Sequence, residues 1–325
     1  MPPHSPGAAR AEPISAASVA SAASPVVVTL PNAAATQVSQ PLPARNRPRP
    51  FSRLLRDPLF LVGTGILLFM ALLGLSSPLF FPGDPLAIVG EPFIWPGADA
   101  AHPLGTDALG RDLLAGIAHG ASVSLSVGLA ATAISLLIGI SIGAVAGYFG
   151  GWTDACLSRL VEIFQTLPNF VMLVVIIAIA QPSIMTLSVA IAIVSWPTVA
   201  RLVRAEFRAI REKDYVMAAR SLGFGPGRII LSEILPNALP PIIVTISVKV
   251  AAAILMESAL SFMGLGDPNV VSWGSMIGAG REYLRTGWYM CALPGCTIML
   301  TVLALNLIGD ALNEYLDPRH KGGPR

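Results

Sequence analysis

The chain has 325 residues, of which 54% are hydrophobic and only 12% charged, and its formal net charge is +2. Soluble domains carry about 25% charged residues, so this composition excludes an ordinary soluble protein and indicates an integral membrane protein. The small net charge gives no sign of a nucleic-acid partner.

The first 45 residues are rich in Ala, Pro and Ser and lack an apolar stretch behind a basic start, so we predict no secretory signal. Such a segment cannot bury enough surface to offset its ordering entropy. We expect residues 1–50 to be a disordered cytoplasmic tail. The remaining predicted units are a first membrane helix with an extracytoplasmic loop (51–116), a core transmembrane domain (117–317) and a short cytoplasmic tail (318–325).

Six apolar stretches are long enough to cross a bilayer core, which takes about 20 residues. They cover approximately residues 59–81, 121–149, 160–180, 183–203, 238–262 and 293–312. Only Gln181 and Pro182 separate the third and fourth stretches, so we expect a tight antiparallel pair there. The predicted fold class is an all-α membrane protein with about six transmembrane helices.

Small residues mark one face of the second stretch. Gly139, Gly143 and Gly147 recur every four residues, which lets another helix approach closely. This spacing predicts a packing seam, and a gating hinge is the alternative. Pro168 in the third stretch is expected to bend or loosen its helix unless neighbours re-satisfy the backbone.

The basic residues set the predicted orientation. Six arginines precede the first stretch, and seven basic residues lie between Arg201 and Arg228, after the fourth stretch. Arg111, Arg281 and Arg285 fall on the opposite side. Because cytoplasmic loops are enriched in Lys and Arg, we predict that both termini and the 204–236 loop face the cytoplasm.

A short amphipathic helix is predicted at 214–222 in this loop. Asp214 can cap its start, and Gly223 follows where helices often end in a left-handed residue. Its expected apolar face, at three- and four-residue spacing, consists of Tyr215, Ala218, Ala219 and Leu222. Such a face can enter a partner's groove, or it can pack on the chain's own helices.

The same segment resembles the cytoplasmic signature of importer permeases of the ATP-binding-cassette class. That signature has Glu-Ala-Ala, a Gly four residues later and then a Leu-Pro pair. The matching residues are Ala218, Ala219, Gly223, Leu235 and Pro236. Met217 stands where the signature has Glu, so the chain lacks the charge that would form a salt bridge or cap there.

Further motifs follow in the same order as in the dipeptide, oligopeptide and nickel permeases. They are His102-Pro-Leu-Gly-Thr-Asp-Ala-Leu-Gly-Arg-Asp112, Gly147-Tyr-Phe-Gly-Gly-Trp-Thr-Asp154, Leu235-Pro-Asn-Ala-Leu-Pro-Pro241, Glu257-Ser-Ala-Leu-Ser-Phe-Met-Gly-Leu-Gly266 and Leu316-Asp-Pro-Arg319. Together they extend from about residue 53 to 319. The chain is similar to the second, C-type permease subunit of that family.

The resemblance implies the type I fold of these importer permeases, a place in the inner membrane and the import of peptides or related solutes such as nickel chelates. It also implies partners: a second homologous permease, two ATPase subunits and an extracytoplasmic substrate-binding protein, besides membrane lipid. The chain lacks a Walker-type loop, so we expect it to bind no cofactor and ATP and Mg to lie on the ATPases. Tyr215, Met217, Ala218, Ala219, Leu222 and Gly223 would then form the ATPase-coupling helix.

The outer loop contains charges close together in sequence. We expect Arg111 to pair with Asp107, Asp112 or both and so to brace the start of the second span; solute binding is the alternative. His102 and His119 have no metal-ligand spacing, so no metal site is expected.

Two charges fall inside the fifth stretch, Lys249 and Glu257. Eight residues apart, they lie near the same helix face, and charge at membrane depth should face a polar interior. Our hypothesis is that this face lines the substrate pathway, with Lys249 attracting carboxylates of a peptide. The alternative is that each pairs with the partner permease. The flanking arginines (Arg201, Arg204, Arg208 and Arg211) are expected to meet anionic lipid or acidic residues of the ATPase.

Two other function classes compete with this interpretation. A proton-coupled secondary transporter would use Glu162 and Glu257 as relay sites and would be supported by an inverted repeat, which we do not find. A polytopic membrane enzyme would need an arrangement such as Ser-His-Asp or His-Glu-x-x-His, and none is visible. We therefore expect no enzyme activity from the chain itself.

Overall fold

The computed structural model describes residues 51–316, with side-chain surroundings from Leu54 onward. The two predicted tails, 1–50 and 318–325, lie outside the described residues. The elements are η1 (Phe51–Arg56), α1 (Pro58–Phe80), α2 (Leu113–Phe149), α3 (Gly151–Thr166), α4 (Asn169–Ile179), α5 (Ile184–Arg211), α6 (Asp214–Ser221), α7 (Pro226–Arg228), η2 (Ile229–Ile234), α8 (Leu235–Phe262), α9 (Trp273–Gly280), η3 (Arg281–Tyr283) and α10 (Tyr289–Leu316). The element η2 is one π-helical segment that leads directly into α8.

Five helical segments within 51–316 are long and apolar enough to cross a membrane: α1, α2, α5, the α7–η2–α8 unit and α10. A sixth span requires α3 and α4 to be taken together, although they are bent by 83°. The expected bend at Pro168 is therefore confirmed, and the predicted span over 160–180 consists of two helices at a sharp angle. The break falls at Leu167 and Pro168, where Leu167 is extended, as expected of a residue before proline.

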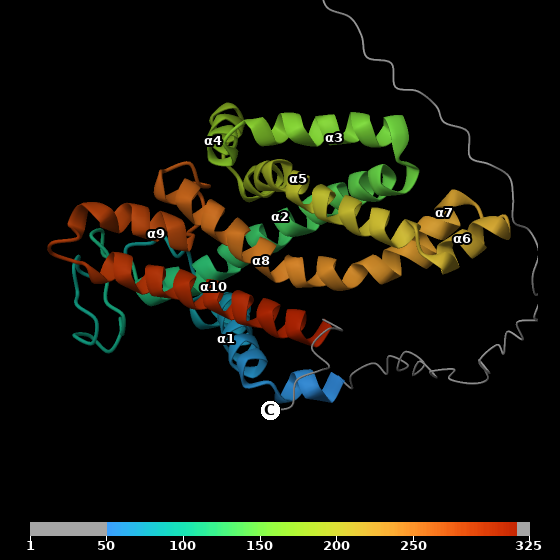
Figure 1. Cartoon of the computed structure of the whole chain (residues 1–325). Helices are drawn as coiled ribbons and strands as arrows, with labels where there is room; N and C mark the ends of the chain where they lie inside the picture. The colour runs from blue at the N-terminus through green and yellow to red at the C-terminus, as the bar shows by residue number, and fades with distance from the viewer. Residues whose placement is uncertain (1–50, 317–325) are drawn as a thin grey trace, which may run out of the picture. The chain divides into compact units, whose positions relative to one another are not determined.

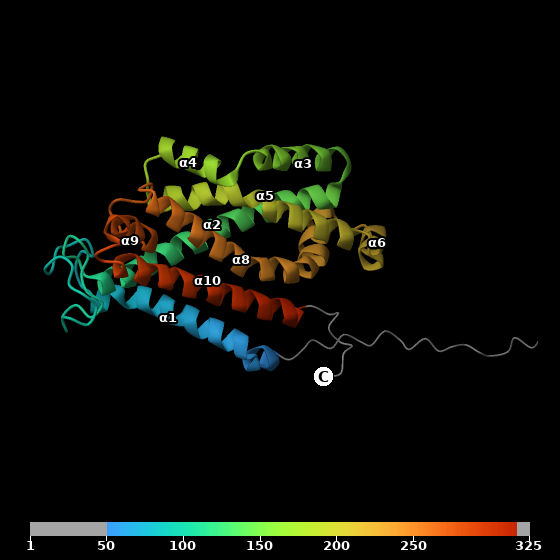
Figure 2. The same cartoon turned by 60° about the vertical axis from the view of Figure 1, so that its left-hand side comes forward.

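The helices form layers (Figures 1 and 2). Helices α2, α5 and α8 contact one another, α3 and α4 lie along α5, and α1 packs on α10 and α2. At one end of this bundle lie α6 and α7, together with the start of α1 and the end of α10. The 82–112 segment and α9 lie at the opposite end.

The predicted glycine seam on α2 packs against α5. A Cβ atom added at Gly139 would lie 2.6 Å from the Cβ of Val199, and one at Gly143 would lie 2.5 Å from the carbonyl oxygen of Ala200. At Gly147 it would lie 2.6 Å from the Cβ of Phe207. The small residues thus permit close helix contact, which confirms the packing interpretation.

Short polar side chains begin the long helices. Asp57 accepts a hydrogen bond from the Leu59 amide at 2.9 Å at the start of α1. Ser183 begins α5 and accepts a hydrogen bond from the Thr186 amide at 3.1 Å. Such caps satisfy amides that have no partner within their helix, so local sequence fixes where these spans start.

Candidate functional site

The short helix α6 occupies Asp214–Ser221, as the sequence predicts to within one residue. Gly223 adopts φ +79°, and its amide donates to the Arg220 carbonyl at 2.9 Å. The Phe224 amide donates to the Ala219 carbonyl at 3.2 Å, which completes a Schellman ending. The predicted Asp214 cap is wrong: Lys213 holds the capping position and no side chain caps the helix.

One face of α6 attaches the helix to the bundle. Val216 is fully buried and Ala219 is 6% exposed, in a cluster with Phe207 of α5 and with Ile229 and Ile234 of η2. The prediction that Ala219 belongs to the outward apolar face is therefore wrong. The helix is fixed by two small side chains between the end of α5 and the start of the α8 unit.

Several apolar side chains of α6 and its C-terminal end remain exposed, beside the polar Asp214, Arg220 and Ser221. Tyr215, Met217 and Leu222 are 40%, 47% and 74% exposed, and Ala218 is also exposed. Partial burial, together with the negative charge of Glu233, raises the pKa of the Tyr215 phenol above its usual value. The neutral phenol of Tyr215 and the exposed side chain of Leu222 together form an apolar surface of the kind that binds another protein.

Internal contacts occupy most of the arginines beside α6. Arg204 and Arg208 of α5 contact Asp154 of α3, with 2.8 Å between Arg204 Nη2 and Asp154 Oδ2. Arg211 donates to the carbonyl of Tyr148 at 3.0 Å at the end of α2, where a cation is favoured by the helix dipole. Arg204 and Arg211 are thus engaged within the chain, whereas Arg208 remains 54% exposed; contact of the arginines with lipid or an ATPase stays a prediction.

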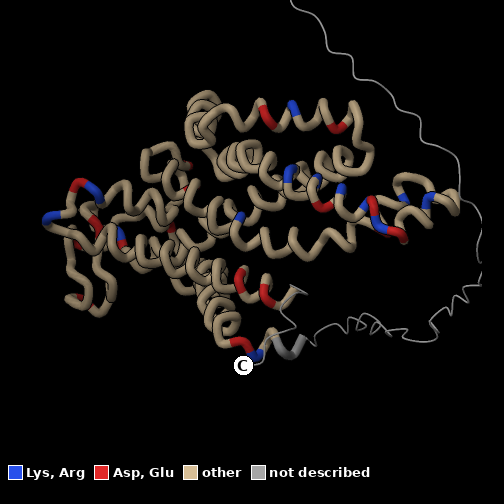
Figure 3. Tube along the Cα trace, in the orientation of Figure 1, with Lys and Arg blue, Asp and Glu red and all other residues tan. Residues whose placement is uncertain are grey.

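Lys249 lies half-buried in the middle of α8. Arg201, on α5, is exposed, and within 51–316 neither Lys249 nor Arg201 forms an ion pair. Figure 3 shows how few charges lie along the middle of the bundle compared with its two ends. Lys249 is therefore a cation without an ion-pair partner, among the described residues, in the middle of a membrane-spanning helix.

Glu257, two turns after Lys249, has a different environment. It is 1% exposed and accepts hydrogen bonds from Ser124 Oγ of α2 at 3.0 Å and from Ser261 Oγ at 2.7 Å. Ser258 Oγ donates to it at 3.4 Å. The prediction that Glu257 lines a pathway is contradicted by its burial in this structure. The carboxylate instead links α2 to α8.

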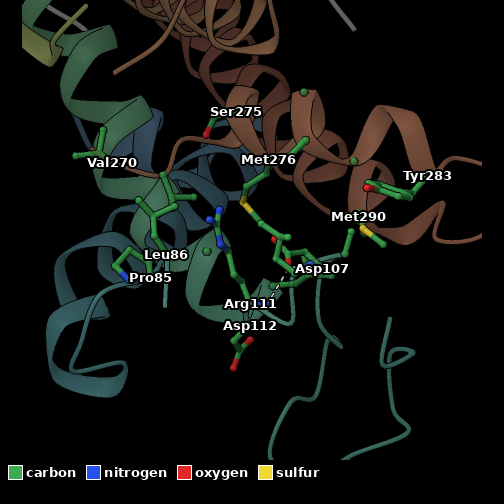
Figure 4. A pocket seen from close by; sticks show the side chains of 18 of the residues that line it. Pro85, Leu86, Asp107, Arg111, Asp112, Val270, Ser275, Met276, Tyr283 and Met290 are labelled. Carbon is green, nitrogen blue, oxygen red and sulfur yellow. Dashed lines mark hydrogen bonds between the residues drawn. The ribbon is translucent and has the colours of Figure 1, made fainter. Parts of the chain in front are cut away.

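The outer-loop charges are arranged differently from the prediction. Asp107 Oδ1 accepts from the backbone amides of Leu109 and Arg111, both at 2.8 Å. Asp112 caps α2 through the Leu114 amide at 2.7 Å, and its other oxygen lies 3.1 Å from His102 Nδ1. The predicted ion pair of Arg111 with these carboxylates is therefore wrong. Its guanidinium instead enters a cavity (Figure 4).

Among residues 51–316, no three His, Cys, Asp or Glu side chains are grouped so as to hold a metal ion. Sequence reasoning missed three features of these sites: the Asp154 contacts, the serines around Glu257 and the free Arg111 guanidinium. Only Asp154 had a local signal, because it closes one of the quoted motifs.

Several apolar spans, a break between α3 and α4 and a short amphipathic helix at one end define a polytopic membrane protein. Residues 139–322 match the family described as the binding-protein-dependent transport system inner membrane component. The chain belongs to this family, which confirms the predicted resemblance.

Relatives of known name cover most of the chain. The di/tripeptide transport system permease protein DppC of Pseudomonas aeruginosa is 41% identical over 79% of this chain and 88% of its own length. The dipeptide transport system permease protein DppC of Alkalihalophilus pseudofirmus is 38% identical, covering 83% and 89%. The probable D,D-dipeptide transport system permease protein DdpC of Escherichia coli is also 38% identical, covering 82% and 89%.

Solved structures share the fold at lower identity. A chain of the MetNI methionine ABC transporter, in an inward-facing conformation, aligns with a TM-score of 0.51 and 17% identity over 62% of this chain and 96% of that chain. A second crystal form gives a TM-score of 0.50 and 19% identity. The all-helical importer-permease fold predicted from the sequence is confirmed.

Proposed function

We propose that this chain is one permease subunit of an ATP-driven importer of di- or oligopeptides. It would pair with a second, homologous permease, bind two ATPase subunits that hold ATP and Mg, and receive solute from an extracytoplasmic binding protein. The peptide-permease names of the relatives support the substrate class. No observation favours the proton-coupled alternative, and Glu257, one of its two relay residues, is occupied by three serines.

The observation that carries the proposal is the two-faced helix α6. Val216 and Ala219 attach it to the bundle, whereas Tyr215, Ala218 and Leu222 are exposed among the described residues 51–316. We assign the outward face, together with Met217 and the Gly223 turn, to a cleft in an ATPase subunit. Insertion of an amphipathic helix into a groove is a common recognition mode.

The contacts of α6 supply a mechanical route into the membrane. The helix touches the end of α5 and the π-helical segment η2, and η2 runs directly into α8. Closure of the ATPases would push α6 and shift α8 relative to α5. Access would then alternate between two packed arrangements.

The arrangement of the chain ends supports a cytoplasmic position for α6. The start of α1 and the end of α10 lie at the same end of the bundle as α6 (Figure 2), and that end contains most of the lysines and arginines (Figure 3). Enrichment in basic residues marks cytoplasmic loops. Both termini would therefore face the cytoplasm.

Lys249 of α8 and Arg201 of α5 are the cations of the proposed pathway that would meet substrate. Lys249 lies in the middle of a membrane-spanning helix, and within 51–316 neither cation forms an ion pair. A peptide carries at least one carboxylate at neutral pH, so these two cations would attract its C-terminal end. Glu257 is not part of this pathway proposal, because it is buried.

A cross-linking experiment tests the coupling proposal. The three native cysteines are first replaced, since Cys156 and Cys296 are exposed, and a single cysteine is then placed at Leu222. Co-expressed ATPase subunits should cross-link to Leu222→Cys, and the yield should change when ATP is added. A cysteine at Leu284, 53% exposed directly after η3 and before α10, is the control. No ATPase cross-link at position 222 would refute the proposal.

A further inference from the structure

A cavity of ≈450 Å³ lies at the end of the bundle opposite α6. Its walls come from the outer loop, the start of α2, the loop before α9, and α9 with η3. Small-molecule sites typically enclose about 300–1,000 Å³. The cavity is therefore large enough for a short peptide or a similar solute.

Arg111 is the cation that enters this cavity. Its Nε atom is buried and has no hydrogen-bond partner, and within residues 51–316 its guanidinium forms no ion pair. Figure 4 shows the guanidinium directed between Leu86 and Met276, while the Asp112 carboxylate points away from it. A buried guanidinium nitrogen without an acceptor is costly, so the site is incomplete without an anionic ligand.

Other contacts already occupy the carboxylates nearest in sequence. Asp107 accepts two backbone amides of its own turn, and Asp112 caps α2 and contacts His102. Asp267, also in the lining, accepts from the Asn269 side chain at 3.1 Å and from the Ile184 amide at 3.3 Å. These contacts hold the acids in place and leave the Arg111 fork free.

The rest of the lining suits a peptide of variable side chain. Met276 and Met290 contribute flexible thioether side chains, which adapt to different apolar shapes. Ser275 and Tyr283 contribute hydroxyl groups, and Glu282 adds a carboxylate that can attract an amino group. The cavity thus combines one cation, several acceptors and adaptable apolar walls.

We infer that this cavity is an outer holding site for a free short peptide, with the C-terminal carboxylate bound by Arg111. The planar guanidinium fork matches a carboxylate in a bidentate manner. Resting on the peptide-import function proposed above, the site would hold the peptide between its release from the binding protein and its passage along α5 and α8. A peptide whose C-terminal carboxylate is replaced by an uncharged amide would lose its main attraction to Arg111.

The test uses the assembled permease pair with its ATPases in lipid nanodiscs, without the binding protein. Saturation-transfer NMR measures the binding of L-alanyl-L-alanine and of its C-terminal amide. The wild-type complex should bind the acid at least about tenfold more tightly than the amide. Arg111→Met should abolish that preference, and Arg111→Lys should restore part of it. Arg285→Met, an exposed arginine outside the cavity lining at the same end, should leave binding unchanged.

A second variant covers the case in which Arg111→Met fails to fold. Ala279 is exposed at the cavity wall, so Ala279→Trp should obstruct the space and weaken dialanine binding while Arg111 stays intact. Dialanine binding unchanged in both Arg111→Met and Ala279→Trp would overturn the inference. A separate titration of the binding protein onto the same nanodiscs covers the other occupant: Arg111→Met weakening its docking while dialanine binding stays unchanged would also overturn the inference, since Arg111 would then meet an acidic side chain of that protein. Failure of the Leu222 cross-link with dialanine binding intact would refute the coupling proposal alone.

Discussion

Replacing Leu222 by alanine should weaken attachment of the ATPase subunits without unfolding the permease. The side chain is 74% exposed, and complete burial of a leucine is worth about 1.5–3 kcal/mol. Docking that covers its exposed part therefore contributes about 1–2 kcal/mol, so the dissociation constant should rise roughly 5- to 30-fold. Titration of labelled ATPase subunits onto the permease pair in nanodiscs measures this constant. ATP-driven uptake of dialanine should fall in parallel at limiting ATPase concentration.

Two further variants make the comparison specific. Leu284→Ala removes a side chain that is 53% exposed between η3 and α10, and it should leave ATPase affinity unchanged. Val216→Ala removes two buried methyl groups from α6 and should lower the free energy of unfolding by about 1–3 kcal/mol, twice the value typical of one buried methyl group. An ATPase affinity for Leu222→Ala within twofold of that for Leu284→Ala would refute the assignment of the outward face.

Three other variants test the membrane interior. Gly143→Ala places a Cβ 2.5 Å from the Ala200 carbonyl oxygen and should cost about 1–3 kcal/mol of stability; thermal unfolding should show this loss, whereas Gly65→Ala, with open space at its Cβ, should be neutral or stabilising. Glu257→Ala leaves three serine hydroxyls without their acceptor and should destabilise by roughly 2 kcal/mol or more; an unchanged melting temperature would contradict the linking role. Lys249→Met should preserve the melting temperature but lower the uptake rate of dialanine by a larger factor than that of its C-terminal amide. If the substitution lowered both uptake rates by the same factor, Lys249 would not act on the peptide carboxylate in the pathway.

Local sequence determines much of α6 but not its orientation. The end of the helix was predictable because Gly223 takes a left-handed conformation that other residues rarely adopt. The buried face was not, because Ala219 packs against Ile229 and Ile234 of a π-helical segment whose geometry no short-range pattern reveals. Apolar residues at three- and four-residue spacing predict an amphipathic helix, and only tertiary contacts decide which side is covered.

The partners of the charged residues could not be predicted from the sequence either. Nearness in sequence made an Arg111 pair with Asp107 or Asp112 the natural expectation, but backbone amides compete for those carboxylates. In the turn, Gly110 has φ +81° and the Arg111 amide points at Asp107. Glu257 finds Ser124, a partner 133 residues away. Pairings over such distances depend on the packed arrangement of helices, which composition and spacing alone do not supply.

The contacts around α6 also indicate which helices would move together in the proposed cycle. Asp154 joins α3 to α5 through Arg204 and Arg208, and Arg211 joins α5 to the end of α2. These charge-assisted bonds hold the three helices as one unit at the cytoplasmic end assigned above. Movement of α2, α3 and α5 relative to one another would break these bonds. A displacement of α6 would therefore more easily move a helix outside that unit.

The α8 unit is attached more loosely at the same end. Within residues 51–316 no ion pair involves η2 or α8, and α6 meets η2 through the apolar side chains of Val216, Ile229 and Ile234. Sliding one apolar surface along another costs less free energy than breaking a bidentate ion pair. Two consecutive prolines, at 240 and 241, further remove backbone hydrogen bonds from the first turns of α8. In the proposed cycle, ATPase closure would therefore displace α8 against the α2–α3–α5 unit and change the space around Lys249.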